Sequence, residues 1–398
     1  MMLTLFLATA HLQTGDSLTL RAALERARAA RGQVRATAAV VAAARAGVRV
    51  AGTVPNPVLS YGYTDDPPRQ HVTLDQSLDW LLTRGSDQRA AQSEVSRSLA
   101  DSAQAAADLA AEVRSAFYGA LAAQEVERVS MAQARLADSL VTIADRRLAS
   151  GDIAPLERDQ MVLEARRAGT RLSLAREVRE VAGTRLARAM GSASPSESFA
   201  LAGSLDNGLD SLLAVSEAGQ GWEMASPLVQ AAVADSAGAA ARAESAGRAR
   251  APLPSIVGGA DWDNPGGPAG PLAVIGVSIP LPLWQHGSGA LAAARADAAR
   301  AAAQVSEARL ESASRVAEAR SRLWGAAERG RTARDSLLPL ARTLSERATT
   351  AYKAGETGII PLLEALRAER DVAAETIDDL LSFQEARAEW RRTRGEAE

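Results

Sequence analysis

The spacing of apolar residues predicts long helical hairpins. Between residues 86 and 149, Val129, Leu136 and Ile143 follow one another at intervals of seven, which is the spacing of a coiled-coil helix. No proline interrupts this segment, so we expect one helix of about 64 residues, about 96 Å long at 1.5 Å per residue. A second helical pattern runs from 155 to 190. Together the two segments are predicted to form an antiparallel helical hairpin.

The second half of the chain repeats this plan. Hairpins are expected at 86–190 and at 289–392, and each turns at a glycine, Gly151 or Gly355, that is followed by an acidic residue. The two glycines are 204 residues apart, which indicates an internal duplication. Pro339 is an irregularity in the second hairpin, because proline disrupts a helix interior and puts the straightness of this helix in doubt.

The duplication divides the chain into structural repeats at 15–210 and 211–398. In each repeat the apolar spacing changes from 3.6 to 2 between a short helix and the long hairpin, which predicts a β-hairpin there. These β-hairpins are expected at 57–80 and 254–282, with strands of about ten residues. The turn of the second one is expected at 264–268.

Aromatic residues gather at these strands. Tryptophan and tyrosine are enriched at membrane–water interfaces, although they also favour strands in general. We therefore consider two interpretations, interface anchors and ordinary hairpin packing, and adopt the first. The residues in or beside the predicted strands are Tyr61, Tyr63, Trp80, Trp262 and Trp284.

Neither element is expected to be stable in a single chain. A two-stranded hairpin is marginal in water, and four short strands cannot close a barrel. If several protomers each supply four strands, every backbone group is paired and the apolar side chains can face lipid. The long hairpins likewise need neighbouring hairpins to bury their apolar seams. Both elements therefore predict oligomerisation.

Composition favours helices over a thick aromatic core. Alanine accounts for 88 of the 398 residues, whereas Phe, Trp and Tyr together number only 14. Basic residues number 45 and acidic residues 48, so the net charge of −3 argues against a nucleic-acid partner. Lys353 is the only lysine, and we attribute the 44 arginines to genomic composition rather than to phosphate binding.

Residues able to carry chemistry are scarce. The absence of cysteine excludes disulfides, thiolate metal sites and a lipid-anchored cysteine. The three histidines, His11, His71 and His286, are widely separated, so no metal or cofactor site is expected. Carboxylate pairs at 65–66 and 378–379 lack a histidine, serine or glycine-rich partner, so no catalytic residues and no enzymatic activity are predicted.

The amino-terminal residues resemble a short secretory signal. No run of 18 apolar residues occurs, so no transmembrane helix is expected. Residues 2–8 are apolar, and Ala8-Thr9-Ala10 fits a small-residue cleavage site, although a charged start is missing. A signal segment is therefore expected at 1–14.

An ordered set of short segments resembles the TolC-like outer-membrane efflux proteins. Leu18 to Ala27 resembles the opening helix of that family, and Pro55 to Tyr61 resembles the entry to its first strand. Val277 to Pro282 resembles the exit from its last strand. Ser150 to Asp152 and Ala354 to Glu356 resemble its two helix-turn tips. Each segment alone is a weak signal, but the set covers nearly the whole chain.

The resemblance implies a mainly α protein with a small β part. It implies a homotrimer in which long antiparallel hairpins form a periplasmic α-barrel, and four strands per protomer form a 12-stranded β-barrel in the outer membrane. It also implies three kinds of partner: outer-membrane lipid, a periplasmic adaptor and an inner-membrane pump. The protein would conduct exported substrates passively. The tips implied to dock the adaptor are Gly151, Asp152, Ile153, Gly355, Glu356 and Thr357.

Several alternatives remain open at this stage. The tip glycines are expected to be helix caps in any case, and copies of Asp152 and Glu356 could equally form acidic rings that favour cations or remain solvated. A soluble coiled-coil scaffold is the competing function. Gly32 stands where the second repeat has Ser226-Pro227, a departure from the family pattern at a helix break. The sequence leaves the cargo open among drugs, metal cations and proteins.

Overall fold

A computed structural model describes residues 17–192, 199–211, 226–267 and 270–397. The expected signal segment 1–14 and Pro268 of the expected turn lie outside these residues. The chain divides into two compact units, to both of which the long helices contribute. We call them the helical unit (1–32, 106–219 and 316–398) and the sheet unit (33–105 and 220–315).

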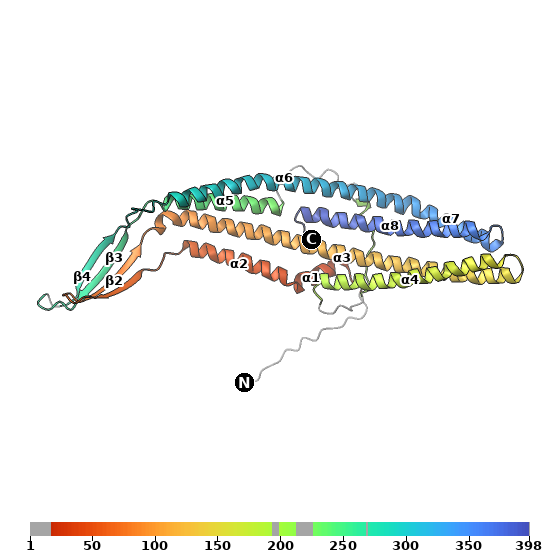
Figure 1. Ribbon diagram of the computed structural model, residues 1–398, viewed down its shortest axis with the longest axis horizontal. Coiled ribbons are helices and arrows are strands. Elements are labelled where there is room, and N and C mark those ends of the chain that lie inside the picture. The colour runs from red at the N-terminus through yellow and green to blue at the C-terminus, as the bar shows by residue number, and fades with distance from the viewer. Residues whose placement is uncertain (1–16, 193–198, 212–225, 268–269, 398) are drawn as a thin grey trace, which may run out of the picture. The chain divides into compact units, whose positions relative to one another are not determined.

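The sheet unit contains one four-stranded antiparallel sheet in the order β1-β2-β3-β4. Each hairpin of the sheet is flanked by a helix on either side in the chain, as Figure 1 shows. This element order occurs twice. The elements are α2 (Gly32–Gly52), β1 (Val58–Tyr63), β2 (Gln70–Ser77), α3 (Trp80–Ala149), α5 (Pro227–Arg248), β3 (Ser255–Trp262), β4 (Leu272–Ser278) and α6 (Ser288–Thr332).

The strands are shorter than the ten residues predicted. They contain 6, 8, 8 and 7 residues. The alternation that continues to Leu78 and Trp80 predicts that the first β-hairpin extends to residue 80. In the structure the Ser77 hydroxyl instead accepts a hydrogen bond from the Asp79 amide at 3.3 Å and turns the chain. Trp80 is consequently the first residue of α3, which begins six residues before the predicted Ser86.

The helical unit contains the far parts of α3 and α6 together with five further elements. Two of these elements begin as their sequences suggest. The Thr19 hydroxyl caps α1 by accepting a hydrogen bond from the Ala22 amide at 3.3 Å, and Pro155 opens α4. The further elements are α1 (Leu20–Ala30), α4 (Pro155–Ala189), η3 (Ala333–Leu337), α7 (Leu338–Ala354) and α8 (Ile359–Thr393).

The two departures from the family pattern have different outcomes. Despite Gly32, the chain still breaks between α1 and α2, because Arg31 is extended at φ −71° and ψ 121°. Pro339 follows a π-helical segment, η3, in which the Leu338 amide bonds to the Ala333 carbonyl. Proline lacks an amide hydrogen and crowds the carbonyl four residues earlier, and a wider turn accommodates both effects.

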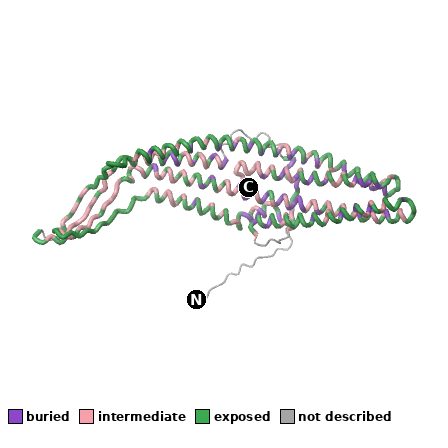
Figure 2. The backbone as a smooth tube through the Cα atoms, in the orientation of Figure 1, coloured by how far each residue is buried: buried purple, intermediate pink, exposed green. Residues whose placement is uncertain are grey.

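The core of the helical unit lies where α3, α4 and α8 meet (Figure 2). Its largest buried side chains include Phe117, Leu140, Met161 and Phe383. Many of the other buried residues are alanines, and their small side chains let the helices approach closely. No helix among the described residues combines the length and the hydropathy needed to span a membrane.

Candidate functional site

The two hairpin turns have the same glycine-capped geometry. Gly151 and Gly355 have φ values of 79° and 78°, in the left-handed region. The Asp152 amide donates to the Arg147 carbonyl at 2.8 Å, and the Glu356 amide donates to the Ala351 carbonyl at 2.9 Å. This six-to-one bond is that of a Schellman cap, so the expectation that both glycines are caps is confirmed.

The other predicted tip residues differ in exposure. Asp152 and Glu356 are exposed, and the Asp152 carboxylate accepts a 2.7 Å hydrogen bond from the Ser150 hydroxyl. Thr357 is half-buried. Ile153 is only 8% exposed, so its side chain belongs to the core rather than to the tip surface that we predicted for it.

One apolar cluster joins the two tips. Tyr352 is fully buried in it, and burial raises the pKa of its phenol. The Arg147 side chain donates from Nη1 to the Tyr352 carbonyl at 3.1 Å, and its guanidinium lies 4.9 Å from the centre of the tyrosine ring. The neighbouring Lys353 is exposed. The cluster consists of Leu140, Ala144, Ile153, Met161, Tyr352, Ile359, Leu362 and Leu363.

A second polar link joins the hairpins further from the turns. Glu164 on α4 is 8% exposed, and its carboxylate accepts a 2.6 Å hydrogen bond from Arg171 on the same helix. Arg370 on α8 reaches the same carboxylate at 3.9 Å. The buried glutamate therefore has one arginine partner in each hairpin.

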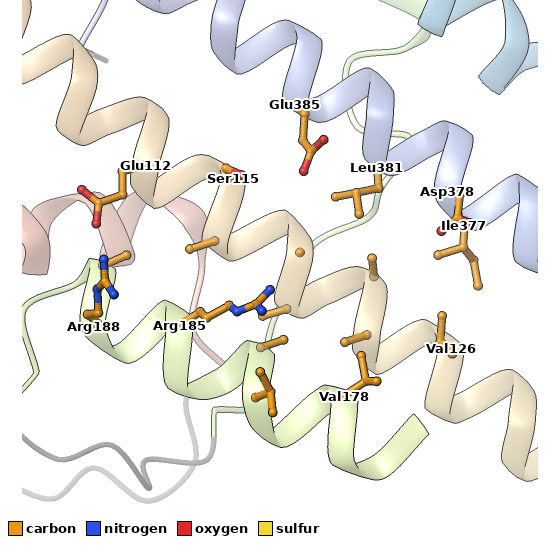
Figure 3. A pocket seen from close by; sticks show the side chains of 18 of the residues that line it. Glu112, Ser115, Val126, Val178, Arg185, Arg188, Ile377, Asp378, Leu381 and Glu385 are labelled. Carbon is orange, nitrogen blue, oxygen red and sulfur yellow. The ribbon is translucent and has the colours of Figure 1, made fainter. Parts of the chain in front are cut away.

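Further from the turns than these contacts, a groove separates α4 from α8. It encloses about 750 Å³ over a floor of small α3 residues such as Gly119 and Ala120. Figure 3 shows Arg185 and Arg188 on the α4 wall and Glu385 on the α8 wall. The two hairpins are thus in direct contact near the turns, and this groove opens between them further along.

The sheet presents one apolar face and one polar face. Residues paired across antiparallel strands point to the same side, so Leu59, Leu74, Gly258 and Ile275 form one row. Ile275 is 89% exposed. The apolar face carries Leu59, Tyr61, Tyr63, Val72, Leu74, Ile256, Ala260, Trp262, Ala273, Ile275 and Val277.

The opposite face carries most of the polar side chains, although Val58, Val257, Leu272 and Val274 also lie on it and Gln70 and Gln76 lie on the apolar face. On the polar face the His71 Nδ1 lies 2.9 Å from an Asp261 carboxylate oxygen, and the Ser255 hydroxyl donates to Asp75 at 3.1 Å. Gly259 has no room for a side chain, since a Cβ there would lie 2.3 Å from the Val72 carbonyl oxygen. The polar members of this face are Ser60, His71, Thr73, Asp75, Ser77, Ser255, Asp261 and Ser278.

The predicted aromatic anchors lie near both ends of the strands. Tyr63 and Trp262 flank Gln70 in the row nearest the hairpin loops. Trp284 lies six residues beyond the end of β4 and is 88% exposed. Trp80 begins α3, and Tyr61 lies one row inside Tyr63 on the apolar face.

Comparison with known proteins gives one relative in sequence and several in structure. No family model matches the chain. The chain is 28% identical over 360 residues to the cobalt-zinc-cadmium resistance protein CzcC of Cupriavidus metallidurans, covering 89% of this chain and 84% of the relative.

Solved structures of outer-membrane proteins share the fold over almost the whole chain. The open-state MtrE channel of Neisseria gonorrhoeae aligns with a TM-score of 0.77 and 17% identity, over 95% of this chain and 89% of MtrE. The outer-membrane protein VceC of Vibrio cholerae aligns with a TM-score of 0.75 and 16% identity, over 94% of this chain and 96% of VceC. The chain has the TolC-like outer-membrane channel fold.

The resemblance noted in the sequence is therefore confirmed, as is the mainly α fold with a small antiparallel sheet. The solved structures that share this fold are proteins of the outer membrane. They do not support the competing soluble scaffold.

Sequence reasoning did not assign two exposed apolar residues to the tips. Leu156 is 69% exposed and Ile360 is 63% exposed. Each lies five residues after the turn glycine of its own hairpin, Gly151 or Gly355. Comparing equal offsets in the two repeats would have found this pair.

Proposed function

We propose that the chain is the outer-membrane channel of a tripartite efflux or secretion system and that it works as a homotrimer. The observation that carries this proposal is the two-faced sheet. β1 and β4 are its free edges, and an exposed edge strand seeks a partner strand. Three copies would pair β1 with β4 of the next protomer into a 12-stranded barrel, with the apolar face toward lipid and the polar face toward the lumen.

Apolar stripes on the helices support the same assembly. Leu163 and Leu174 on α4 are exposed, as are Leu340 and Leu344 on α7. Such stripes are stable when they pack against other helices, and neighbouring protomers would supply those helices in an α-barrel.

Conduction through this barrel would be passive, with the tips as the gate. Arg147 and the Glu164–Arg370 pair link the two hairpins of a protomer, so loosening these links lets the hairpins move apart. We place contact with a periplasmic adaptor at the exposed turn residues, Gly151, Asp152, Gly355 and Glu356, with an inner-membrane pump supplying the cargo. The name of CzcC makes divalent metal cations the first cargo to test.

Sizing of detergent-extracted protein by light scattering tests the assembly. We expect a trimer that partitions into membranes and conducts ions in planar bilayers. A monomer that stays in solution without detergent would falsify the proposal and favour the coiled-coil scaffold.

A further inference from the structure

The end of the sheet where the strands join the helices, which we call the base, brings together the ends of α2, α3, α5 and α6. Contacts confirm that these helix ends lie together. A Cβ at Gly52, the last residue of α2, would meet the Gln88 side chain of α3 at 2.5 Å. Arg248, the last residue of α5, donates from Nη1 to the Leu82 carbonyl of α3 at 3.3 Å.

Three exposed arginines at the base form no ion pair with a carboxylate of the described residues: Arg49, Arg84 and Arg250. The Arg84 guanidinium lies 5.5 Å from the centre of the Trp80 ring. Arg250 donates from Nε to the His286 carbonyl at 3.2 Å. Both contacts orient the side chains without neutralising their charge.

The carboxylates of the base are already engaged. Glu244 is shared by Arg89 and Arg248 at 2.6 and 2.5 Å. The Asp87 carboxylate accepts a hydrogen bond from the Ser245 hydroxyl, and Asp79 accepts one from the Leu253 amide. Among the described residues, no carboxylate therefore lies within ion-pair distance of Arg49, Arg84 or Arg250.

Exposed apolar residues adjoin this charge. The apolar face of the sheet ends at the base with Ile256 and Val277, and the chain after β4 continues with exposed Leu281, Leu283 and Trp284. Along this surface, apolar residues are followed by tryptophan and then by arginine. This order matches a membrane surface, where acyl chains give way to polar head groups.

We infer that Arg49, Arg84 and Arg250, with Trp80 and Trp284, bind the phosphate groups of anionic phospholipids where the sheet leaves the membrane. The inference rests on the proposed membrane channel. Guanidinium groups pair well with phosphate, and each basic residue at an anionic surface strengthens binding. A zwitterionic lipid carries its own cation beside the phosphate, so anionic lipid is preferred.

Quenching of tryptophan fluorescence by brominated lipid tests this preference. The full-length protein in nonionic micelles would be titrated with brominated phosphatidylglycerol or brominated phosphatidylcholine. For R84Q/R250Q we expect the half-quenching concentration of phosphatidylglycerol to rise about 25-fold, at about fivefold per arginine. R84K/R250K retains the charge and should recover most of the affinity. Arg309 is also exposed and forms no ion pair within the part of the chain that the structure describes. It lies about 30 Å along α6 from the base, so R309Q should match the parent.

Three results would overturn the inference. The first is that both lipids half-quench the parent at the same concentration. The second is that R84Q/R250Q and R309Q have the same half-quenching concentration. The third is that millimolar inorganic phosphate displaces phosphatidylglycerol, which would indicate a site for a soluble anion. Trimer size and bilayer conductance would be measured on the same samples. A conducting trimer without a lipid preference would overturn the lipid inference alone, whereas a monomer that does not conduct would overturn the proposed channel.

Discussion

At the scale of single residues, substitutions at the turn glycines test folding separately from the proposed docking. Gly151→Val and Gly355→Val would place a β-branched residue in a left-handed conformation, at a cost of about 1–2 kcal/mol each. No atom lies within 4 Å of a Cβ at Gly151, so this cost comes from the backbone rather than from packing. We expect normal trimer yield and barrel insertion but loss of transport and of cross-linking to the adaptor.

Asparagine provides the matched control for these glycines, since it tolerates the left-handed region. Gly151→Asn and Gly355→Asn should keep transport close to that of the parent. If the valine variants export cargo normally, the tips are caps only, and the docking surface lies elsewhere.

The faces of the sheet give a second prediction at the residue scale. Leu74→Arg and Ile275→Arg put a charge on the apolar face, where arginine near the bilayer midplane costs about 2–4 kcal/mol. We expect a smaller heat-resistant trimer fraction in the membrane. Ser60 neighbours Leu59 but points to the polar face, so Ser60→Arg should assemble normally. Equal behaviour of all three variants would refute the assignment of the faces.

At the scale of elements, an ion pair between Arg334 and Asp210 joins η3 to the segment 199–211, which lies after α4 in the chain. Arg334 bonds to Asp210 at 2.8 Å and to Asp335 at 2.7 Å, and these hydrogen bonds lower the pKa of both carboxyl groups from 3.8. Lowered carboxyl pKa values stabilise the fold above the unfolded pKa, and this stabilisation is lost as the pH falls through the folded values. Arg334→Gln should therefore lower the melting temperature at pH 7.

The effect of Arg334→Gln should fade in acid. As the pH falls below about 3.8 and through the lower pKa values of the folded protein, the carboxyl groups become protonated in the parent as well, so the two melting temperatures converge. Melting curves followed by circular dichroism at several pH values test this. A constant difference down to pH 2 would show that Arg334 acts through packing alone.

The helical elements were predictable because they depend on periodicities within the chain. Heptad spacing and a glycine define each long hairpin, and both turned where predicted. Strand ends were less predictable, since the Ser77 hydroxyl overrides the alternation that continues to Trp80. Periodicity also cannot show how Pro339 is accommodated, because a π-helical turn and a kink satisfy the same sequence.

At the scale of the whole molecule, the links between hairpins should control conductance. Arg147→Ala removes the hydrogen bond to the Tyr352 carbonyl and the contact with its ring, and Arg370→Ala removes one partner of Glu164. The double variant should show a higher single-channel conductance in planar bilayers than the parent. Arg166→Ala, an exposed α4 arginine without an ion pair among the described residues, should not. Unchanged conductance in the double variant would place the gate elsewhere.

The positions of the two hairpin turns were predictable, but the exposure of their residues was not. Equal offsets from Gly151 and Gly355 located the tips, yet Ile153 turned inward and the exposed Leu156 was missed. Burial at a turn depends on the neighbouring hairpin, and contacts between distant segments have no signature in local spacing. The Arg147–Tyr352 contact, 205 residues apart in the chain, escaped prediction for the same reason.

The exposed position of Lys353 has a practical consequence. It is the only lysine, and it lies two residues before the second turn glycine. Apart from the α-amino group, an amine-reactive dye therefore has a single side chain to label in each protomer. In a trimer labelled with a donor and acceptor pair, energy transfer between these lysines would report the separation of the tips, without an engineered cysteine.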